Sequence, residues 1–224
     1  MPQELYGGLA NRSAQEVAVN RMLSLDLFRL RHRPGAIAGV DATQCYDCIV
    51  HSLASILAQN EGAPLTPLQS MFTSLQRMQY FLRTKFGESK HYYGGVQAQP
   101  FQGTAQGNGA SPSMWVMISM YLVLLMHNAG FVTQLISAFS GLSVALVGFL
   151  FVDDTDLLVF GSRLDTAQTI CQKLQNMISY WNGILWVSGG ALKEEKMLLV
   201  FGRFCLDQRS MVILNNSSRS DLYP

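Results

Sequence analysis

The sequence predicts an α+β fold in which helices cover one face of a mostly antiparallel sheet. Short apolar runs typical of buried strands occur at residues 36–42, 146–152, 157–160 and 197–201. Longer segments with helical periodicity or capping signals lie at residues 13–31, 49–60, 66–83, 111–130 and 165–181. With 49% apolar residues in a chain of 224, the protein can bury a core as one large domain, or as a domain with an insertion.

Local signals mark the ends of these elements. Ser13 and Glu16 form a capping box, and Pro34 ends the first helix before the strand that carries Asp41. A capping residue followed by proline starts two more helices, at Thr66 and at Ser111. Residues 94–109 are rich in glycine and glutamine and predict a loop, Asp165 is expected to open the last helix, and the polar tail after residue 215 is expected to be loose. The apolar face of the first helix is expected to contain Val17, Leu23, Leu27 and Leu30.

Asp153 and Asp154 separate two strongly apolar runs, which predicts a β-hairpin with an acidic turn. A lone Asp pair is more often a solvated turn, and a lone Asp41 is more often a cap or a strand-end charge. The order of the elements, however, brings the strand end with Asp41 and the hairpin tip to one edge of the sheet. Three carboxylates from two distant segments predict a divalent-metal site, because Mg²⁺ accepts such oxygens together with phosphates and water.

The charge distribution favours no partner for the chain as a whole, since the formal net charge is +1. A local basic cluster of Arg29, Arg31 and Arg33, with His32, is the clearest candidate for contact with nucleic acid. Scattered cysteines and an N-terminus without a signal peptide predict a reducing intracellular compartment.

Residues 91–152 contain no Asp, Glu, Lys or Arg, so a membrane protein has to be considered. Their most apolar pieces, at 114–126 and 142–152, are shorter than the roughly 20 residues that a spanning helix needs. A buried helix and a buried strand fit better, and no membrane association is expected.

Several other reactive side chains have structural interpretations. Asp47 is expected to cap the helix that begins near residue 49, and Asp156 to form a salt bridge or to support a metal ligand. Cys45 and Cys48 lack the second pair that a zinc site requires, so they are expected to be packing cysteines. His51 is expected to form a local hydrogen bond rather than to bind metal or to catalyse.

Four motifs, in this order and spacing, resemble the palm motifs of reverse transcriptases. The upstream residues 6–13 resemble the fingers segment of non-LTR retroelement and group II intron enzymes. Two departures from the family pattern are Ala105, where proline is usual, and Lys193, where asparagine is common. The motifs are Asp41-x4-Tyr46-Asp47, Gln102-Gly103-Thr104-Ala105-Gln106-Gly107 with Ser111-Pro112, Phe151-Val152-Asp153-Asp154, and Gly190-Ala191-Leu192-Lys193-Glu194-Glu195-Lys196.

The resemblance implies a polymerase palm with partial helical fingers, acting as an RNA-directed DNA polymerase from a retroelement. Such an enzyme joins deoxynucleoside triphosphates to a DNA primer on an RNA template, using two Mg²⁺ ions that Mn²⁺ can replace. The implied metal ligands are Asp41, Asp153 and Asp154. Of the remaining positions, Tyr46 would exclude a 2′-hydroxyl, Gln106 and Gly107 would touch template and nucleotide, and Lys196 would act on the triphosphate or the leaving pyrophosphate.

The same resemblance divides the chain into partial fingers at 1–35, a first palm part at 36–60, a fingers insertion at 61–98, a second palm part at 99–202 and a loose tail at 203–224. The resemblance does not extend to a first fingers segment or to a thumb. Both regions are expected to be needed for activity, because such polymerases draw much of their primer-template affinity from phosphate contacts on these surfaces.

Two alternatives from other classes stay open. A catalytically inactive retroelement remnant would keep the palm fold and bind RNA without turnover. A viral RNA-dependent RNA polymerase fits less well, because that class usually spaces its first two acidic residues one position closer and lacks the Gln-Gly loop.

Overall fold

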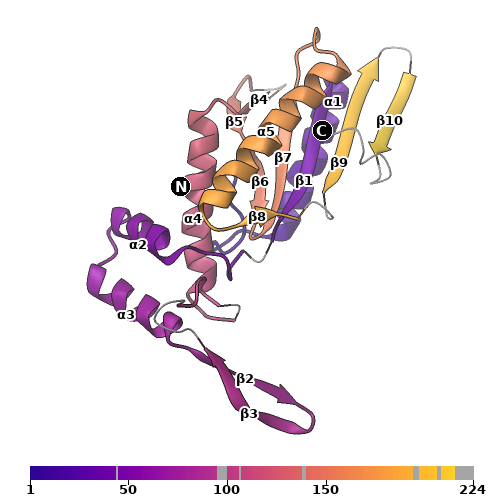
Figure 1. Cartoon of the computed structure of the whole chain (residues 1–224). Helices are drawn as coiled ribbons and strands as arrows, with labels where there is room; N and C mark the ends of the chain where they lie inside the picture. The colour runs from indigo at the N-terminus through magenta and orange to yellow at the C-terminus, as the bar shows by residue number, and fades with distance from the viewer. Residues whose placement is uncertain are drawn as a thin grey trace.

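The computed structural model describes residues 1–43, 45–94, 100–105, 107–137, 140–193, 197–205 and 208–214, with side chains described as far as residue 200. Its central sheet has the strand order β10–β9–β1–β7–β6, and each neighbouring pair is antiparallel (Figure 1). The short strand β8 pairs with the end of β1. The predicted α+β fold with a mainly antiparallel sheet is therefore confirmed. The strands are β1 (Gly35–Thr43), β6 (Gly148–Phe151), β7 (Asp154–Phe160), β8 (Ala191–Leu192), β9 (Leu198–Cys205) and β10 (Gln208–Leu214).

Helices pack on both faces of this sheet (Figure 1). Helices α4 (Ser111–Asn128) and α5 (Ala167–Val187) share the main core with Ala36 and Ala38 of β1. Helix α1 (Ala14–Leu30) lies on the opposite face, where its Phe28 packs against Ile37. Because neighbouring residues of a strand point to opposite faces, burial on both sides explains why β1 is almost continuously apolar.

The N-terminal helix begins as predicted but buries different residues. Both hydrogen bonds of the Ser13–Glu16 capping box are present. Leu23 and Leu30, expected on the apolar face, are 59% and 75% exposed, whereas Ser24 and Phe28 are buried. Ser24 can be buried because its hydroxyl donates to the Asn20 carbonyl one turn earlier.

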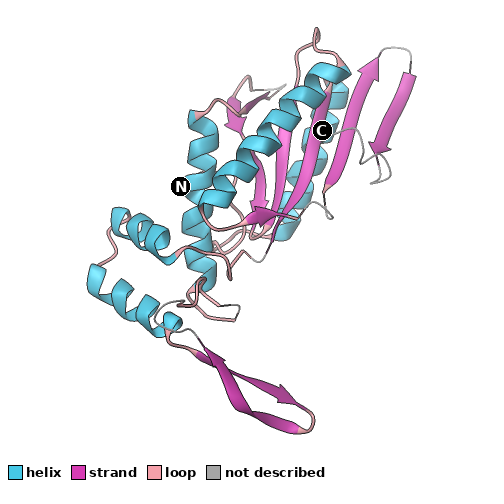
Figure 2. Ribbon diagram, viewed as in Figure 1, coloured by secondary structure: helices cyan, strands magenta, loops and turns pink. Residues whose placement is uncertain are grey.

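Helices α2 (His51–Asn60) and α3 (Leu65–Gln76) extend from one end of the sheet (Figure 1), and their buried residues join the main core. The predicted helix at 66–83 is wrong in its second half. The chain leaves α3 at Gln76 and forms a hairpin of β2 (Gln79–Thr84) and β3 (Gly87–Gly94), which projects from the body (Figure 2). Cross-strand aromatic pairs and a turn at Gly87, whose φ is +121°, favour the hairpin over a helix.

A second hairpin, of β4 (Thr133–Ile136) and β5 (Ser143–Leu146), also lies where no strand pair was predicted. The Thr133 hydroxyl donates to the Leu158 carbonyl (2.7 Å) and accepts from the Phe160 amide (3.2 Å), which attaches β4 to β7. The apolar run at 146–152 is divided between β5 and β6 at Val147.

The C-terminal elements follow the prediction more closely. Helix α5 is capped by Thr166, while the neighbouring Asp165 forms an ion pair with Lys173. Strand β10 lies inside the segment expected to be a loose tail, and residues 215–224 lie outside the described part of the chain. None of the helices in the described residues is long and apolar enough to cross a bilayer.

Candidate active site at the acidic turn

The sheet register brings Asp41 and Asp154 directly opposite each other. They are antiparallel partners at the end of the β1–β7 ladder, and Phe151 is the partner of Asp154 across the β6–β7 hairpin. Val152 and Asp153 therefore form the turn, and the Ala42 amide donates to the Asp153 carbonyl (3.1 Å). The predicted meeting of strand end and hairpin tip is confirmed.

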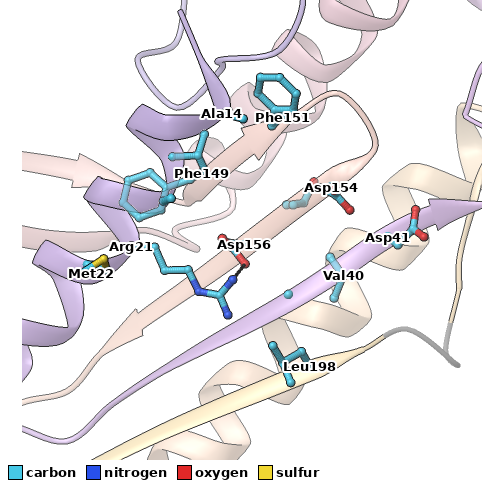
Figure 3. Close-up of a pocket in the computed structure, with 14 residues that line it drawn as sticks. Ala14, Arg21, Met22, Val40, Asp41, Phe149, Phe151, Asp154, Asp156 and Leu198 are labelled. Atoms are coloured by element: carbon cyan, nitrogen blue, oxygen red, sulfur yellow. Dashed lines mark ion pairs between the residues drawn. The ribbon is translucent and has the colours of Figure 1, made fainter.

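Asp41 and Asp154 line a cavity of about 540 Å³ between α1 and the sheet (Figure 3). Asp156 lines the same cavity, because it lies two residues from Asp154 and thus on the same face of β7. Asp41 is buried, at 7% exposure, whereas Asp154 is exposed. The cavity thus has an acidic floor on the sheet face that α1 covers.

Asp156 is held by helix α1. Its Oδ1 lies 3.5 Å from Nη1 of Arg21, as the dashed line in Figure 3 shows. Burial raises the pKa of the Asp156 carboxyl and the nearby Asp154 adds to this, while Arg21 opposes it. The predicted salt bridge of Asp156 is confirmed, and its partner comes from α1.

The acidic turn is fixed by contacts from two other segments. Val152 has a φ of +57°, a conformation that is strained for a β-branched residue. The indole N–H of Trp115, on α4, donates to the Val152 carbonyl at 2.6 Å. Gly7 packs so closely that a Cβ there would lie 2.3 Å from the Val152 nitrogen. These contacts stabilise a backbone that would otherwise relax, so the position of Asp153 is set by neighbours from these two segments.

A glycine-containing loop docks on the segment that follows Asp41. The Gly103 amide donates to the Ile49 carbonyl (2.8 Å), and the Thr104 amide donates to the Tyr46 carbonyl (2.7 Å). The buried Ser111 hydroxyl is within 2.9 Å of the Thr104 carbonyl and 2.8 Å of the Ala105 carbonyl. The loop that continues to Gly107 is thereby tied to Tyr46, as the motif assignment requires, while Gln106 lies outside the described residues.

Sequence reasoning did not anticipate that His51 organises this loop. His51 is buried, its Nε2 hydrogen-bonds to the Gly103 carbonyl, and its Nδ1 lies 3.1 Å from the Gln76 amide nitrogen. The ring also lies against Phe72, with centroids 4.6 Å apart. His51 forms hydrogen bonds, but the expectation that they would be local is wrong, because both partners are distant in sequence. No spacing pattern could have identified them.

Burial and nearby carboxylates raise the pKa values of the thiols and of Tyr46. Burial, followed by Asp153, Asp41 and Asp47, raises the pKa of Cys45 to about 12. Burial and Asp47 raise the pKa of Cys48, and burial, Cys45 and Asp153 raise that of Tyr46. Both cysteines are free and stay protonated at neutral pH, as packing cysteines do. Asp47 is exposed, and α2 is capped by Val50 without a side-chain bond, so the predicted capping role of Asp47 is wrong.

The fit of the acidic residues to a divalent ion is partial. The donors are the carboxylate oxygens that Mg²⁺ prefers, and the register sets Asp41 opposite Asp154 with Asp153 next to it. In the part of the chain that the structure describes, however, no three His, Cys, Asp or Glu side chains are arranged so that they could hold a metal ion together. The backbone suits such a site, while the side chains as placed do not complete it.

Two further predicted groups lie near the sheet. The Lys193 amide donates to the Asp41 carbonyl (2.9 Å), so the fourth motif starts beside the acidic residues, although Lys196 lies outside the described residues. Of the basic cluster, Arg29 is exposed, Arg31 donates to the Ile136 carbonyl (3.2 Å), and Arg33 lies over the Phe160 ring at 5.5 Å. Contact of these arginines with nucleic acid stays a prediction.

Comparison with known proteins relates the chain to telomerases by structure alone. No family model and no curated protein matches it. Telomerase of Candida tropicalis in complex with a TWJ fragment of telomeric RNA superposes with a TM-score of 0.56 at 13% identity, over 89% of this chain and 30% of that one. The apo C. tropicalis enzyme truncated from its C-terminal domain gives 0.53 at 16% identity, over 95% and 38%. Telomerase of Candida albicans, also with a TWJ fragment of telomeric RNA, gives 0.56 at 13% identity, over 96% and 32%.

The chain thus spans about a third of the length of the telomerase chains that it matches. At such low identity the similarity concerns the fold. The chain has a palm-like α+β fold, similar to that of part of the telomerase structures.

Proposed function

We propose that the chain is the core of an RNA-directed DNA polymerase of retroelement origin, which adds deoxynucleotides to a primer 3′-hydroxyl. The observation that carries this proposal is the opposition of Asp41 and Asp154, with Asp153 in the adjoining turn. The register thus brings acidic positions from two distant segments together, and carboxylate oxygens are the ligands that Mg²⁺ prefers.

In this proposal Asp41, Asp153 and Asp154 hold two Mg²⁺ ions, which Mn²⁺ can replace. When bound, the ions supply Lewis-acid activation of the attacking hydroxyl and stabilise the leaving pyrophosphate. The protein contributes a fixed backbone, because Trp115 and Gly7 hold the acidic turn against α4 and the N-terminal segment.

The loop beside Tyr46 provides the nucleotide contacts. Gly107 has a φ of +92°, and a Cβ there would meet no atom of the described residues within 4 Å, so its backbone is open on that side to an approaching nucleotide or template. Tyr46 is half-buried at the base of this loop, where its ring would exclude a 2′-hydroxyl. Gln106 and Lys196 would contact the template and the triphosphate.

The RNA template is supported in general terms by two telomerase structures that contain telomeric RNA. Because the chain spans only about a third of those proteins, further fingers and thumb segments are included in the proposal as contributors to primer-template affinity.

Primer extension tests the proposal. We expect the longest reading frame that contains this sequence to extend a DNA primer on an RNA template with Mg²⁺ or Mn²⁺. Asp153→Asn should lower extension by at least about 100-fold, because it removes a charge from the metal site. Asp26→Asn, an exposed carboxylate on α1 outside the motifs, is the matched control and should retain activity. Full extension by the Asp153 variant would overturn the assignment.

A second candidate is an inactive remnant that binds RNA. It is favoured by one observation: no three metal-binding side chains among the described residues come together to hold an ion. Binding of RNA without extension under either metal, by the wild-type reading frame, would select this candidate.

A further inference from the structure

The β2–β3 hairpin is an exposed arm that no other part of the proposed mechanism uses. It projects from the end of α3, away from the central sheet (Figure 2). All residues of β2 are exposed, and β3 is exposed except for the half-buried Ser89 and Gly94. Isolated two-stranded hairpins are only marginally stable in water, so contacts between side chains are needed to keep this arm folded.

One face of the arm provides its stability. Tyr80 and Tyr93 are cross-strand partners with centroids 5.6 Å apart, and Phe101 lies edge-on to both, at 5.2 Å and 5.0 Å. Such aromatic clusters add to the stability of a strand pair beyond the area that they bury. The base of the arm is therefore fixed without help from the other face.

The opposite face presents aromatic rings to solvent. Phe81 and Tyr92 are the next cross-strand pair, so their side chains point to the other side of the hairpin. They lie 5.8 Å apart and are 46% and 56% exposed. At the tip, Phe86 is 89% exposed, and the Lys85 ammonium lies 4.9 Å from the centre of its ring.

The arm also concentrates positive charge. Residues 79–94 contain three basic residues and one acidic residue, a formal charge of +2, whereas the whole chain carries +1. The rest of the chain therefore carries −1, and the arm stands out as its basic part. The three cations are Arg83, Lys85 and Lys90.

We propose that this arm binds single-stranded nucleic acid, with Phe81, Phe86 and Tyr92 stacking on unpaired bases and Arg83, Lys85 and Lys90 contacting phosphates. Exposed rings between cations fit a strand whose bases are free, because every base offers a face for stacking and the phosphates complement the basic charge. Paired bases in a duplex would not be available to these rings. The arm is thus a binding site separate from the acidic turn, and the proposal goes beyond the polymerase function.

Anisotropy of short fluorescein-labelled oligo(dT) and oligo(U), measured with the full chain in EDTA, tests the arm directly. The double variant Phe81→Ala/Tyr92→Ala should weaken binding by at least about 20-fold, since each lost stacking contact corresponds to roughly 5- to 150-fold. Phe81→Trp/Tyr92→Trp should restore it. Trp186→Ala, which removes a 74%-exposed ring from α5, is the matched control and should leave affinity unchanged.

A charge variant keeps the test independent of hairpin folding. Lys85→Gln/Lys90→Gln changes exposed side chains only and should reduce the slope of log affinity against log salt by about 1.4 if both cations contact phosphates. Arg163→Gln, an exposed cation beyond β7, is its control. Unchanged affinity and slope in both arm variants would overturn the proposal. Comparison of oligo(dT) with oligo(U) distinguishes DNA from RNA as the natural strand.

Two outcomes separate this inference from its rivals. In the first outcome, the protein floats with phosphatidylcholine–phosphatidylserine vesicles, and Leu82→Ala/Phe86→Ala abolishes flotation without affecting oligonucleotide binding. This result would make the arm a lipid-binding element and overturn the proposal. Because EDTA removes divalent ions, the binding assay does not depend on metal at the acidic turn. Loss of extension activity therefore cannot be mistaken for failure of the arm, and failed extension by the wild type leaves the binding result intact.

Discussion

Ala105 shows at the residue scale how a departure from a family motif can be tied to backbone geometry. Its φ is +62°, and its carbonyl accepts from Asn108 N–H (3.2 Å) and lies 2.8 Å from the Ser111 hydroxyl. Proline is locked near −65°, so the residue usual in the family could not adopt this conformation. The substitution of alanine and the left-handed backbone are therefore consistent with each other.

Replacing Ala105 should change stability in opposite directions. Glycine relieves the left-handed strain and is expected to raise the free energy of unfolding by up to about 1 kcal/mol. Proline should lower it by at least about 2 kcal/mol, because the loop would have to leave its hydrogen bonds. Urea unfolding checks both, with Ala129→Gly, where φ is −79°, as a control that should not stabilise. Equal stability of the glycine and proline variants would contradict the loop geometry.

Asp156 makes the free energy of unfolding depend on pH. Because burial raises its folded-state pKa above the unfolded value, the native state binds more protons between those two pKa values, and stability falls as pH rises through that window. Asp156→Asn resembles the protonated side chain. We expect the variant's free energy of unfolding to increase relative to that of the wild type from about pH 4 upward, until the folded-state pKa is passed. Chemical denaturation across this range measures the difference, and a difference that is flat or of opposite slope would show that Arg21 outweighs burial.

At the scale of elements, the acidic hairpin depends on the segment before α1. Leu5 bridges Leu150 in parallel, Tyr6 N–H donates to the Leu150 carbonyl (2.9 Å), and the Leu150 amide donates to the Glu4 carbonyl (2.9 Å). The buried Glu4 side chain reaches His127 at the end of α4 (2.6 Å). The N-terminal residues thus continue the sheet beyond β6 and pack against the turn that contains Val152.

Gly7→Ala tests this arrangement, since the added methyl group would collide with the Val152 backbone. We expect a loss of about 1–3 kcal/mol in the free energy of unfolding, because the N-terminal segment or the turn has to shift. Gly109→Ala is the matched control, as a Cβ there meets nothing within 4 Å. Denaturant titration of both variants is sufficient. A Gly7 variant as stable as its control would mean that the segment does not pack closely against the turn in solution.

At the scale of the whole molecule, strands β1, β6 and β7 are largely buried on both faces, and the candidate site lies where these strands end. Helices α4 and α5 provide the larger core, while α1 closes the cavity over Asp41, Asp154 and Asp156. Charge is distributed unevenly over this framework, with acidic groups at the cavity and the basic excess on the arm. Such separation lets one chain offer a cation-binding surface and a phosphate-binding surface at a distance from each other.

Three features could be predicted from the sequence: the fold class, the elements that carry the motifs, and the meeting of Asp41 with the acidic turn. They could be predicted because apolar periodicity, capping residues and the order of strands are local or topological signals. The structure was needed to show that 79–94 form a hairpin arm, that α1 packs through Phe28, and that His51, Trp115 and Gly7 hold the site. These outcomes depend on contacts between residues far apart in the chain. Aromatic pairing across β2 and β3 and burial against the second face of the sheet override the local helical signals, and no pattern within one segment contains that information.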